Sequence, residues 1–354
     1  MNRLQNVSRP QRILIFVLFF VGGLFLIIAL FVFLAIQSFN SGVRAQAQPQ
    51  VDTVGVTEFV ALPDEDAYPA SVAVAPDGTV YTASYVTGTI WAISPLDASV
   101  TELNGSRDTL GSVTGMAVGP DGTLYVVDQL NSDIRSAGGT VWRITGAPAA
   151  PIIESFAAID DAQGFVEPED ITLDTAGNVY VSDRGRGEVW RFAPDGGSST
   201  AWWTAPVAIA ETQPAPNGLA YDPTHDAIIV TDTISNAIYR VTVVDARGIT
   251  IYLHGARAGS PGFDGVAVTP EGHIYVTLLE DHSVALLTET EDLVAPGTLT
   301  AVAAPFRGAS DIAYTSVPTP RFYVTNFDQL ALVLPGVRPQ LPFALDVIYP
   351  TDTP

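Results

Sequence analysis

The fold is decided by a strand, turn and strand stretch that recurs along the chain, as in GMAVGPDGTLYVVD (Gly115–Asp128) and DITLDTAGNVYVSD (Asp170–Asp183). Each copy has a short apolar strand, a turn, and a second strand that opens on an apolar or aromatic residue. The strands alternate and are rich in β-branched and aromatic residues, which is typical of half-buried antiparallel strands. Four further copies are SVAVAPDGTVYTAS (71–84), GLAYDPTHDAIIVTD (218–232), GVAVTPEGHIYVTL (265–278) and DIAYTSVPTPRFYVTN (311–326).

The residue that opens each first strand marks the repeat. These positions are separated by 44 to 55 residues and are Ala70, Thr114, Glu169, Asn217, Asp264 and Ser310. Periods of this length indicate propeller blades or solenoids. Third strands such as TVWRI (140–144) and fourth strands such as IIESFAAI (152–159) and GITIYLHG (248–255) complete the blades. The sequence therefore predicts an all-β, six-bladed β-propeller over residues 51–354.

The last blade lacks one strand of its own. After RFYVTN (321–326) the chain runs through the Pro-rich LPGVRPQLP (334–342) to a final strand, FALDVIYP (343–350). The segment VGVTEFVALP (54–63) has no blade, so we expect it to close the ring as the outer strand of blade six. Closure would hide the edges that an open sheet exposes.

The N-terminal part differs in kind from the propeller. Ile13–Ile36 is an uninterrupted run of uncharged, mostly aliphatic and Phe residues, long enough for a transmembrane helix. Three arginines precede the run and one follows it closely: Arg3, Arg9, Arg12 and Arg44. The positive-inside rule then predicts a single-pass membrane protein with a cytoplasmic N-terminus and an extracytoplasmic propeller. The alternative is a long signal peptide, cleaved near Ala45 and Ala47, which would release a secreted propeller.

The expected organisation is a cytoplasmic N-terminus (1–12), a transmembrane helix that serves as signal anchor (13–36), a polar linker (37–50) and the propeller (51–354). The formal net charge is −22, and all 38 acidic residues lie in the propeller part. Such a surface repels phosphate backbones and attracts divalent cations, so nucleic acid is excluded as a partner. Because the chain has no Cys and no Lys, disulfides, thiolate nucleophiles and Schiff-base lysines are excluded as well. The sequence leaves the oligomeric state open.

The six aligned positions should converge at one mouth of the central channel, because the first strand of each propeller blade lines that channel. Three consecutive blades then bring Glu169, Asn217 and Asp264 together, all of them oxygen donors. These ligands suit a hard cation such as Ca²⁺, and they make zinc the least natural choice. The alternative is structural, since Asn-Gly and Asp-Gly pairs are common turn formers.

Other polar residues are assigned by position. Asp128, Asp183 and Asp232 recur at the end of the second strand, with Asn326 in that place in blade six, so we expect them to tie blade to blade. One loop leads to the predicted mouth and carries His254, Arg257 and Phe263. These three are candidate rim or substrate contacts, and His254 is also a candidate proton shuttle.

The residues PNGLAYDP (216–223), FDGVAVTPEGHIYVT (263–277) and the ending FYVTNFDQLALVLPGVRPQLPFALDVI (322–348) resemble the family of senescence marker protein (regucalcin), gluconolactonase and luciferin-regenerating enzyme. The likeness spans 51–354, although the blade repeat also suits NHL-repeat and streptogramin-lyase-like propellers. In that family the blade-four Asn and blade-five Asp bind a divalent metal, usually calcium. The resemblance therefore implies metal binding by Asn217 and Asp264, with Asp264 as general base.

The chain departs from this family at three positions. The metal-binding Glu of blade one is replaced by Ala70, and the common Asn of blade three is replaced by Glu169. A substrate-holding Arg two residues earlier in blade three is replaced by Glu167, at the predicted rim, which argues against a sugar lactone. Compared with the family, blade one lacks a carboxylate at this position and blade three has one instead.

The resemblance implies metal-assisted hydrolysis of a lactone or ester, with the small-molecule substrate at the channel mouth. The alternative is a membrane-anchored propeller that binds a ligand or protein without catalysis. The missing Glu of blade one favours binding, and the succession of Glu169, Asn217 and Asp264 favours a metal site. A streptogramin-type lyase ranks third, because histidines are scarce near the channel.

Overall fold

The computed structural model describes residues 9–40, 46–133, 136–157, 159, 161–207, 212–254, 260–290 and 297–351. The chain divides into two compact units. One consists of Met1–Arg44 together with Leu330–Gln340, and the other of Ala45–Gln329 together with Leu341–Pro354. The second unit is the propeller.

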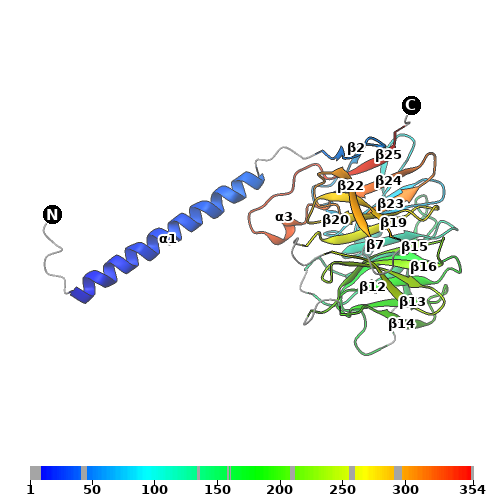
Figure 1. Ribbon diagram of the computed structural model, residues 1–354. Helices are drawn as coiled ribbons and strands as arrows, with labels where there is room; N and C mark the ends of the chain where they lie inside the picture. Colours follow the sequence, from blue (N-terminus) through cyan, green and yellow to red (C-terminus); the bar gives the residue numbers. More distant parts are fainter. Residues whose placement is uncertain are drawn as a thin grey trace. The chain divides into compact units, whose positions relative to one another are not determined.

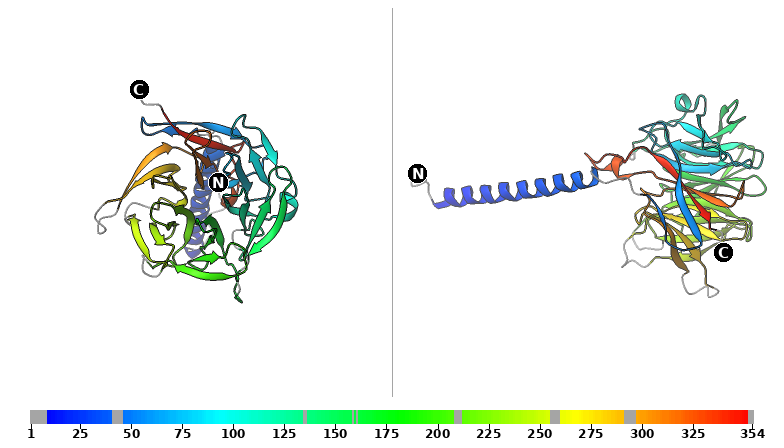
Figure 2. Two further views of the ribbon diagram at one scale, coloured as in Figure 1. Left: turned by 90° about the vertical axis from the view of Figure 1, so that its right-hand side faces the viewer. Right: turned by 90° about the horizontal axis from the view of Figure 1, so that it is seen from above.

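The propeller consists of six antiparallel sheets arranged around an axis (Figures 1 and 2). The inner strand of each sheet touches the inner strands of the two neighbouring sheets, and the sixth touches the first, so the ring is closed. This confirms the predicted six-bladed fold.

The blades follow the chain in order, and each runs from the axis outward. Blade one is β3 (Pro69–Val74), β4 (Val80–Ser84), β5 (Ile90–Ile93) and β6 (Val100–Glu102), followed by the short helix α2 (Ser106–Thr109). Blade two is β7 (Val113–Val118), β8 (Leu124–Asp128), β9 (Thr140–Thr145) and β10 (Ile152–Ala157). Blade three is β11 (Pro168–Leu173), β12 (Val179–Asp183), β13 (Glu188–Phe192) and β14 (Ser199–Thr204).

Blades four to six continue the pattern. Blade four is β15 (Pro216–Asp222), β16 (Ala227–Asp232), β17 (Ala237–Thr242) and β18 (Gly248–Leu253). Blade five is β19 (Phe263–Val268), β20 (Ile274–Leu278), β21 (Ser283–Thr288) and β22 (Thr298–Ala304). Blade six is β23 (Ile312–Thr315), β24 (Arg321–Thr325), β25 (Ala344–Pro350) and β2 (Val54–Ala61).

The ring closes as expected, because the N-terminal strand β2 pairs antiparallel with β25 as the outer strand of blade six. The segment just before β2 is also part of the propeller. There β1 (Gln48–Pro49) adds a fifth strand to blade five by pairing with β22, and Ala47 is buried beside it. The stretch expected as a linker (37–50) is therefore structured at both ends, since α1 (Arg9–Asn40) covers its beginning.

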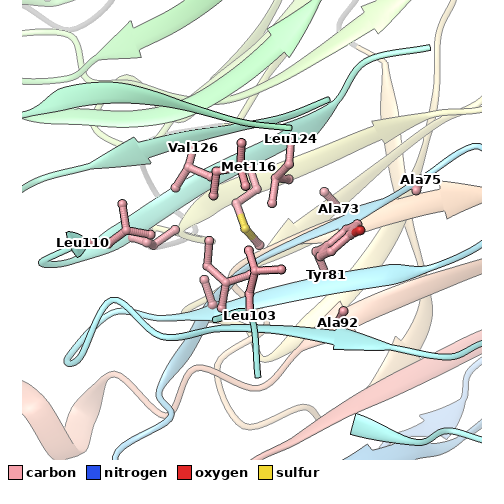
Figure 3. Close-up of a cluster of buried hydrophobic side chains, with 13 residues drawn as sticks. Ala73, Ala75, Tyr81, Ala92, Leu103, Leu110, Met116, Leu124 and Val126 are labelled. Atoms are coloured by element: carbon pink, nitrogen blue, oxygen red, sulfur yellow. The ribbon is translucent and has the colours of Figure 1, made fainter. Parts of the chain in front are cut away.

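The hydrophobic core is divided among the interfaces between neighbouring blades. Between blades one and two, Met116 and Leu124 pack with Ala73 and Tyr81, and Leu103 from the connecting segment joins them (Figure 3). Equivalent clusters join blades two to three, three to four, four to five and five to six. Because each sheet buries both faces against its neighbours, the ring is stabilised interface by interface rather than by one central core.

The other unit contains the apolar N-terminal helix. α1 is 32 residues long and includes the predicted span 13–36. Its most apolar window has a mean hydropathy of 3.2 with no part buried, so its length and composition suffice to cross a membrane. The segment Leu330–Gln340, which carries α3 (Leu330–Val333), belongs to the same unit.

Ring closure by β2 can be tested by truncation. A chain that starts at Leu62 lacks β2 and exposes the edge of β25, so we expect it to lose cooperative thermal unfolding and to aggregate. A chain that starts at Val51 lacks β1 but keeps β2, and it should unfold cooperatively at a slightly lower temperature. Equal behaviour of the two truncations in calorimetry would show that β2 does not close the ring.

Candidate functional site

The predicted mouth residues lie together at one end of the channel. Ala70, Thr114, Glu169, Asn217 and Asp264 are each the second residue of an inner strand, and Ser310 stands just before β23. In blades three, four and five the pairing of the first two strands shifts register across this position. Such a bulge turns a side chain out of the regular alternation of a strand, which explains how these side chains reach the channel.

In blades three and four a hydroxyl on the second strand holds the bulge and connects it to the next blade. Thr231 Oγ1 accepts a hydrogen bond from Gly218 N (2.8 Å) and donates one to Asp264 O (2.6 Å) in blade five. Ser182 Oγ likewise accepts from Asp170 N (3.0 Å) and donates to Asn217 O (2.6 Å). We call these contacts the hydroxyl ties.

The Asp or Asn residues at the ends of the second strands act within their own blade, so the expectation that they tie blade to blade is wrong. Asp183 accepts hydrogen bonds from Val166 N (2.8 Å) and Glu167 N (2.9 Å), in the loop that leads into β11. Asp128 and Asp232 accept equivalent bonds from the loops that lead into β7 and β15, and Asn326 does so before β23. Each side chain fixes the approach to the mouth residue of its own blade.

Glu169 is held by an arginine that the sequence analysis did not single out. Arg184 Nη1 donates to Glu169 Oε1 at 2.9 Å, and Arg184 Nε lies 3.7 Å from Glu167 Oε1. Burial raises the pKa of Glu169, although Arg184 acts in the opposite direction. Arg184 also interacts with Asp264, so one guanidinium serves three carboxyl groups.

Asn217 and Asp264 form a second pair in the mouth. Asn217 Nδ2 donates to Thr233 Oγ1 (3.0 Å), which in turn donates to Phe263 O (2.6 Å). Because the threonine hydroxyl is already a donor to Phe263 O, it can only accept from Asn217, and this fixes the orientation of the amide. The side chain of Asn217 also lies close enough to Asp264 to lower the pKa of that carboxyl.

The surroundings of Asp264 shift its pKa strongly upward. Burial raises its pKa well above the ordinary value, and the nearby carboxyls of Glu169 and Asp311 raise it further, while Arg184 and Asn217 oppose the shift. A carboxyl group in such a place takes up a proton unless positive charge is nearby. Perturbation of this kind is a common property of catalytic acids and bases.

An aromatic residue of blade one faces the same cluster. Burial, together with the nearby carboxyls of Glu169 and Glu167, raises the pKa of Tyr85 to about 12. The ring of Tyr85 packs edge to face on Phe327 at 5.4 Å. The mouth therefore combines carboxyl, amide and guanidinium groups with a tyrosine, from blades one, three, four and five.

The remaining rim candidates are placed differently from the expectation. Glu167 lies beside Arg184 and its side chain is partly exposed. Phe263 is completely buried in the core between blades four and five, so its expected role as a rim contact is wrong. His254 Nδ1 hydrogen-bonds Tyr252 Oη (3.1 Å), and no contact in the described part of the chain links His254 to Asp264. Arg257 lies outside the described residues.

Two further aspartates, the half-buried Asp170 and the buried Asp311, lie one residue beyond the mouth positions of blades three and six. Asp170 accepts from Ile171 N (2.8 Å) and Leu219 N (2.7 Å), and Asp311 accepts from Ile312 N (2.7 Å) and Val72 N (2.8 Å). Each carboxylate thus joins its own strand to the next blade. Burial raises the pKa of Asp311 to about 7, and burial and Asp311 raise that of Asp170.

In three other blades the residue at the position of Asp170 and Asp311 is glycine. A Cβ at these positions would clash with the neighbouring blade. A Cβ on Gly265 would lie 2.5 Å from Asp311 Oδ1, and one on Gly218 would lie 2.2 Å from Asp264 O. The repeat shows Asp at this position in blades three and six and Gly in three other blades, and this difference could have indicated the two aspartates. Beyond them the channel widens into a cavity of about 240 Å³, lined by the later residues of the inner strands.

Metal binding depends on which donor groups lie close together at the mouth. In the ranges that the structure describes, no three His, Cys, Asp or Glu side chains lie close enough together to hold one. Glu169, Asn217 and Asp264 are two carboxyls and one amide, and oxygen donors of this kind suit a hard cation. Their fit requires Glu169 to share its carboxylate with Arg184.

The hydroxyl ties can be tested at Thr231, which is fully buried. Thr231→Val keeps the shape of the side chain but leaves Gly218 N and Asp264 O without this partner. We expect unfolding to become easier by about 2 kcal/mol in urea titrations. Thr231→Ser keeps the hydroxyl and should recover most of that loss. If Val and Ser destabilise equally, packing of the methyl group, rather than the hydroxyl tie, is what matters.

The sequence matches two family models. Residues 207–326, which contain Asn217 and Asp264, match the SMP-30/Gluconolactonase/LRE-like region, and residues 165–192 match the NHL repeat. A comparison with curated proteins gave no match.

Solved structures share the fold at low identity. A gluconolactonase from Xanthomonas campestris is 15% identical, with 88% of this chain and 99% of that chain covered and a TM-score of 0.58. A luciferin-regenerating enzyme is 15% identical, with 84% and 95% covered and a TM-score of 0.60. Virginiamycin B lyase from Staphylococcus aureus is 17% identical, with 77% and 82% covered and a TM-score of 0.53. The chain is therefore a six-bladed β-propeller with an SMP-30/gluconolactonase/LRE-like region at residues 207–326.

Proposed function

We propose that this protein is a hydrolase that opens a lactone or ester at the channel mouth with the help of a divalent cation, for which Ca²⁺ is the favoured candidate. The observation that carries the proposal is the placement of Asn217 and Asp264 next to each other in the mouth, within the family match and beside Glu169. The solved neighbours that are named gluconolactonases support the substrate class.

Glu169, Asn217 and Asp264 would hold the cation, and waters would complete its shell. With the amide nitrogen of Asn217 turned to Thr233, the oxygen Oδ1 is the atom left to face a cation. When bound, the cation supplies Lewis-acid polarisation of the substrate carbonyl. Because blade one contributes Ala70, the protein supplies three ligands in place of the larger set that the family resemblance implies.

Asp264 would accept the proton during hydrolysis. As the water oxygen bonds to the carbonyl carbon, a water proton passes to Asp264, and the bond from that carbon to the alkoxy oxygen then breaks. Asp264 returns the proton to the leaving alkoxide, so the carboxylate is regenerated. Arg184 and Asn217 favour its ionised form against the effect of burial.

A second candidate is a propeller that binds a ligand or a protein without catalysis. Two observations favour it: Ala70 at the blade-one position, and the ion pair that already engages Glu169 with Arg184. Propellers of this fold include both enzymes and binding proteins, so only the chemistry of the site can distinguish the two functions.

For localisation we propose that α1 anchors the protein in a membrane, with the N-terminus in the cytoplasm and the propeller outside. The length and hydropathy of α1 support a span. The orientation rests on the arginines that precede the apolar run.

Calcium binding provides the first test. In calorimetric titrations of the metal-stripped, detergent-solubilised full chain, we expect Ca²⁺ to bind at one site, and Asn217→Ala and Asp264→Ala to abolish that binding. Asp195→Asn removes one carboxylate in an exposed turn and should change nothing. In a screen of lactones and aryl esters with metal present, Asp264→Asn should lower kcat by about 100-fold or more.

The competing outcomes separate the two candidates. Binding that is lost in both mouth variants, with hydrolysis lost alongside, supports the hydrolase. Ca²⁺ binding that is unchanged by both substitutions contradicts the metal site. Ca²⁺ binding without any hydrolysis favours the second candidate.

Arg184 should compete with the cation for Glu169. We expect Arg184→Gln to tighten Ca²⁺ binding by about tenfold or more in the same titration, because it removes a positive charge beside the ligands. Arg184→Lys keeps the charge and should stay near the affinity of the unaltered protein. Weaker binding by Arg184→Gln would show that Arg184 organises the site instead of competing for it.

A further inference from the structure

One segment of blade six does not group with the propeller. Leu330–Gln340 (LALVLPGVRPQ) connects β24 to β25 in the sequence, yet it forms one compact unit with the N-terminal part that contains α1. The segment is therefore more than a connection between two strands.

Its contacts are with the last turn of α1. Asn40 Nδ2 donates to Gly336 O, and Arg338 N donates to Asn40 Oδ1, both at 2.9 Å. A Cβ on Gly336 would lie 3.6 Å from Ile36 Cγ2, and the φ of Gly336 is +86°. The backbone of the segment thus lies directly against the helix, and it satisfies both ends of the Asn40 amide.

These contacts lie at a defined level of the helix. The apolar run Ile13–Ile36 extends about 36 Å at 1.5 Å per residue, which covers the roughly 30 Å hydrocarbon core of a bilayer. Asn40 follows one turn after the run ends, so it reaches the level of the lipid headgroups. Gly336 and Arg338, which bond to Asn40, share that level.

The segment presents apolar side chains to its surroundings. Leu330, Val333 and Leu334 are 37%, 39% and 43% exposed, and no residue of α3 is buried. Arg338 adds a positive charge to a protein whose net charge is −22. Exposed aliphatic residues beside an arginine, at headgroup level, match the chemistry of a membrane interface.

We propose that Leu330–Gln340 is a second membrane contact, which places Leu330, Val333 and Leu334 at the boundary between headgroups and acyl chains, with Arg338 beside lipid phosphates. The lipid is the bilayer that α1 spans. This goes beyond the proposed function, which assigns membrane contact to α1 alone, and it rests on α1 being a membrane span. Contact with α1 selects lipid over a protein partner as the occupant, because Gly336 and Arg338 hold the segment against the last turn of the helix, where the apolar run ends.

The absence of cysteine makes the test direct, since one introduced cysteine is the only thiol. The full chain with Leu334→Cys is labelled with an environment-sensitive fluorophore and reconstituted into vesicles of four parts phosphatidylcholine to one part phosphatidylglycerol. Leu26→Cys in the middle of α1 reports insertion of the helix. Val244→Cys, which is 86% exposed in the turn between β17 and β18, reports the aqueous phase.

The expected result is a blue-shifted emission at position 334, quenched by lipids spin-labelled near the headgroup and protected from iodide in solution. Arg338→Gln should reduce the part of this quenching that depends on phosphatidylglycerol. A label at 334 that behaves like the one at 244, while the label at 26 is quenched by lipid, overturns the proposal. If the label at 26 also stays in water, the membrane anchor itself is refuted, and the second contact with it.

Discussion

The hydroxyl ties are the interactions on which the rest of the site depends. Each hydroxyl accepts a hydrogen bond from an inner-strand N–H and donates one to the carbonyl of the next mouth residue, as Thr231 does for Gly218 and Asp264. It therefore satisfies a bulged backbone and sets the distance between blades in one contact. Because these groups are buried, the alternative is an unpaired donor and acceptor, which costs more than the bond contributes. The geometry of the mouth follows from that constraint.

Charge is the second constraint. The inner strands bring Glu169, Asp170, Asp264 and Asp311 close to one axis, where burial raises the pKa of every one of them. Asp170 and Asp311 are stabilised by backbone N–H groups, whereas Glu169 and Asp264 depend on Arg184 and Asn217. The mouth is consequently a place that favours positive charge, and a guanidinium already provides one. A cation bound by Glu169 and Asp264 would neutralise the same negative charge that Arg184 neutralises.

The predictions from the sequence succeeded where the repeat carried the information. Six copies of one pattern define six blades, and the strand left over at 54–63 had only one open edge to fill, so β2 was assigned correctly. The mouth positions followed from the same alignment. The interpretation failed where partners come from different parts of the chain. Asp183 was expected to reach the next blade but bonds the loop of its own, and Phe263 was expected at the rim but fills the core.

The sequence by itself determined the number of blades, the closing strand, the apolar helix and the polar character of the mouth, because strand alternation, turn residues and hydropathy are local properties that repeat. The tertiary structure alone decided which groups meet: Arg184 with Glu169, Thr233 with Asn217, and Leu330–Gln340 with Asn40. It also decided the direction of the mouth side chains, through the register shifts at Pro168/Ile171, Pro216/Leu219 and Phe263/Val266. A bulge depends on how two strands pair and on which buried group satisfies the extra N–H, and neither follows from the spacing of residues along one strand.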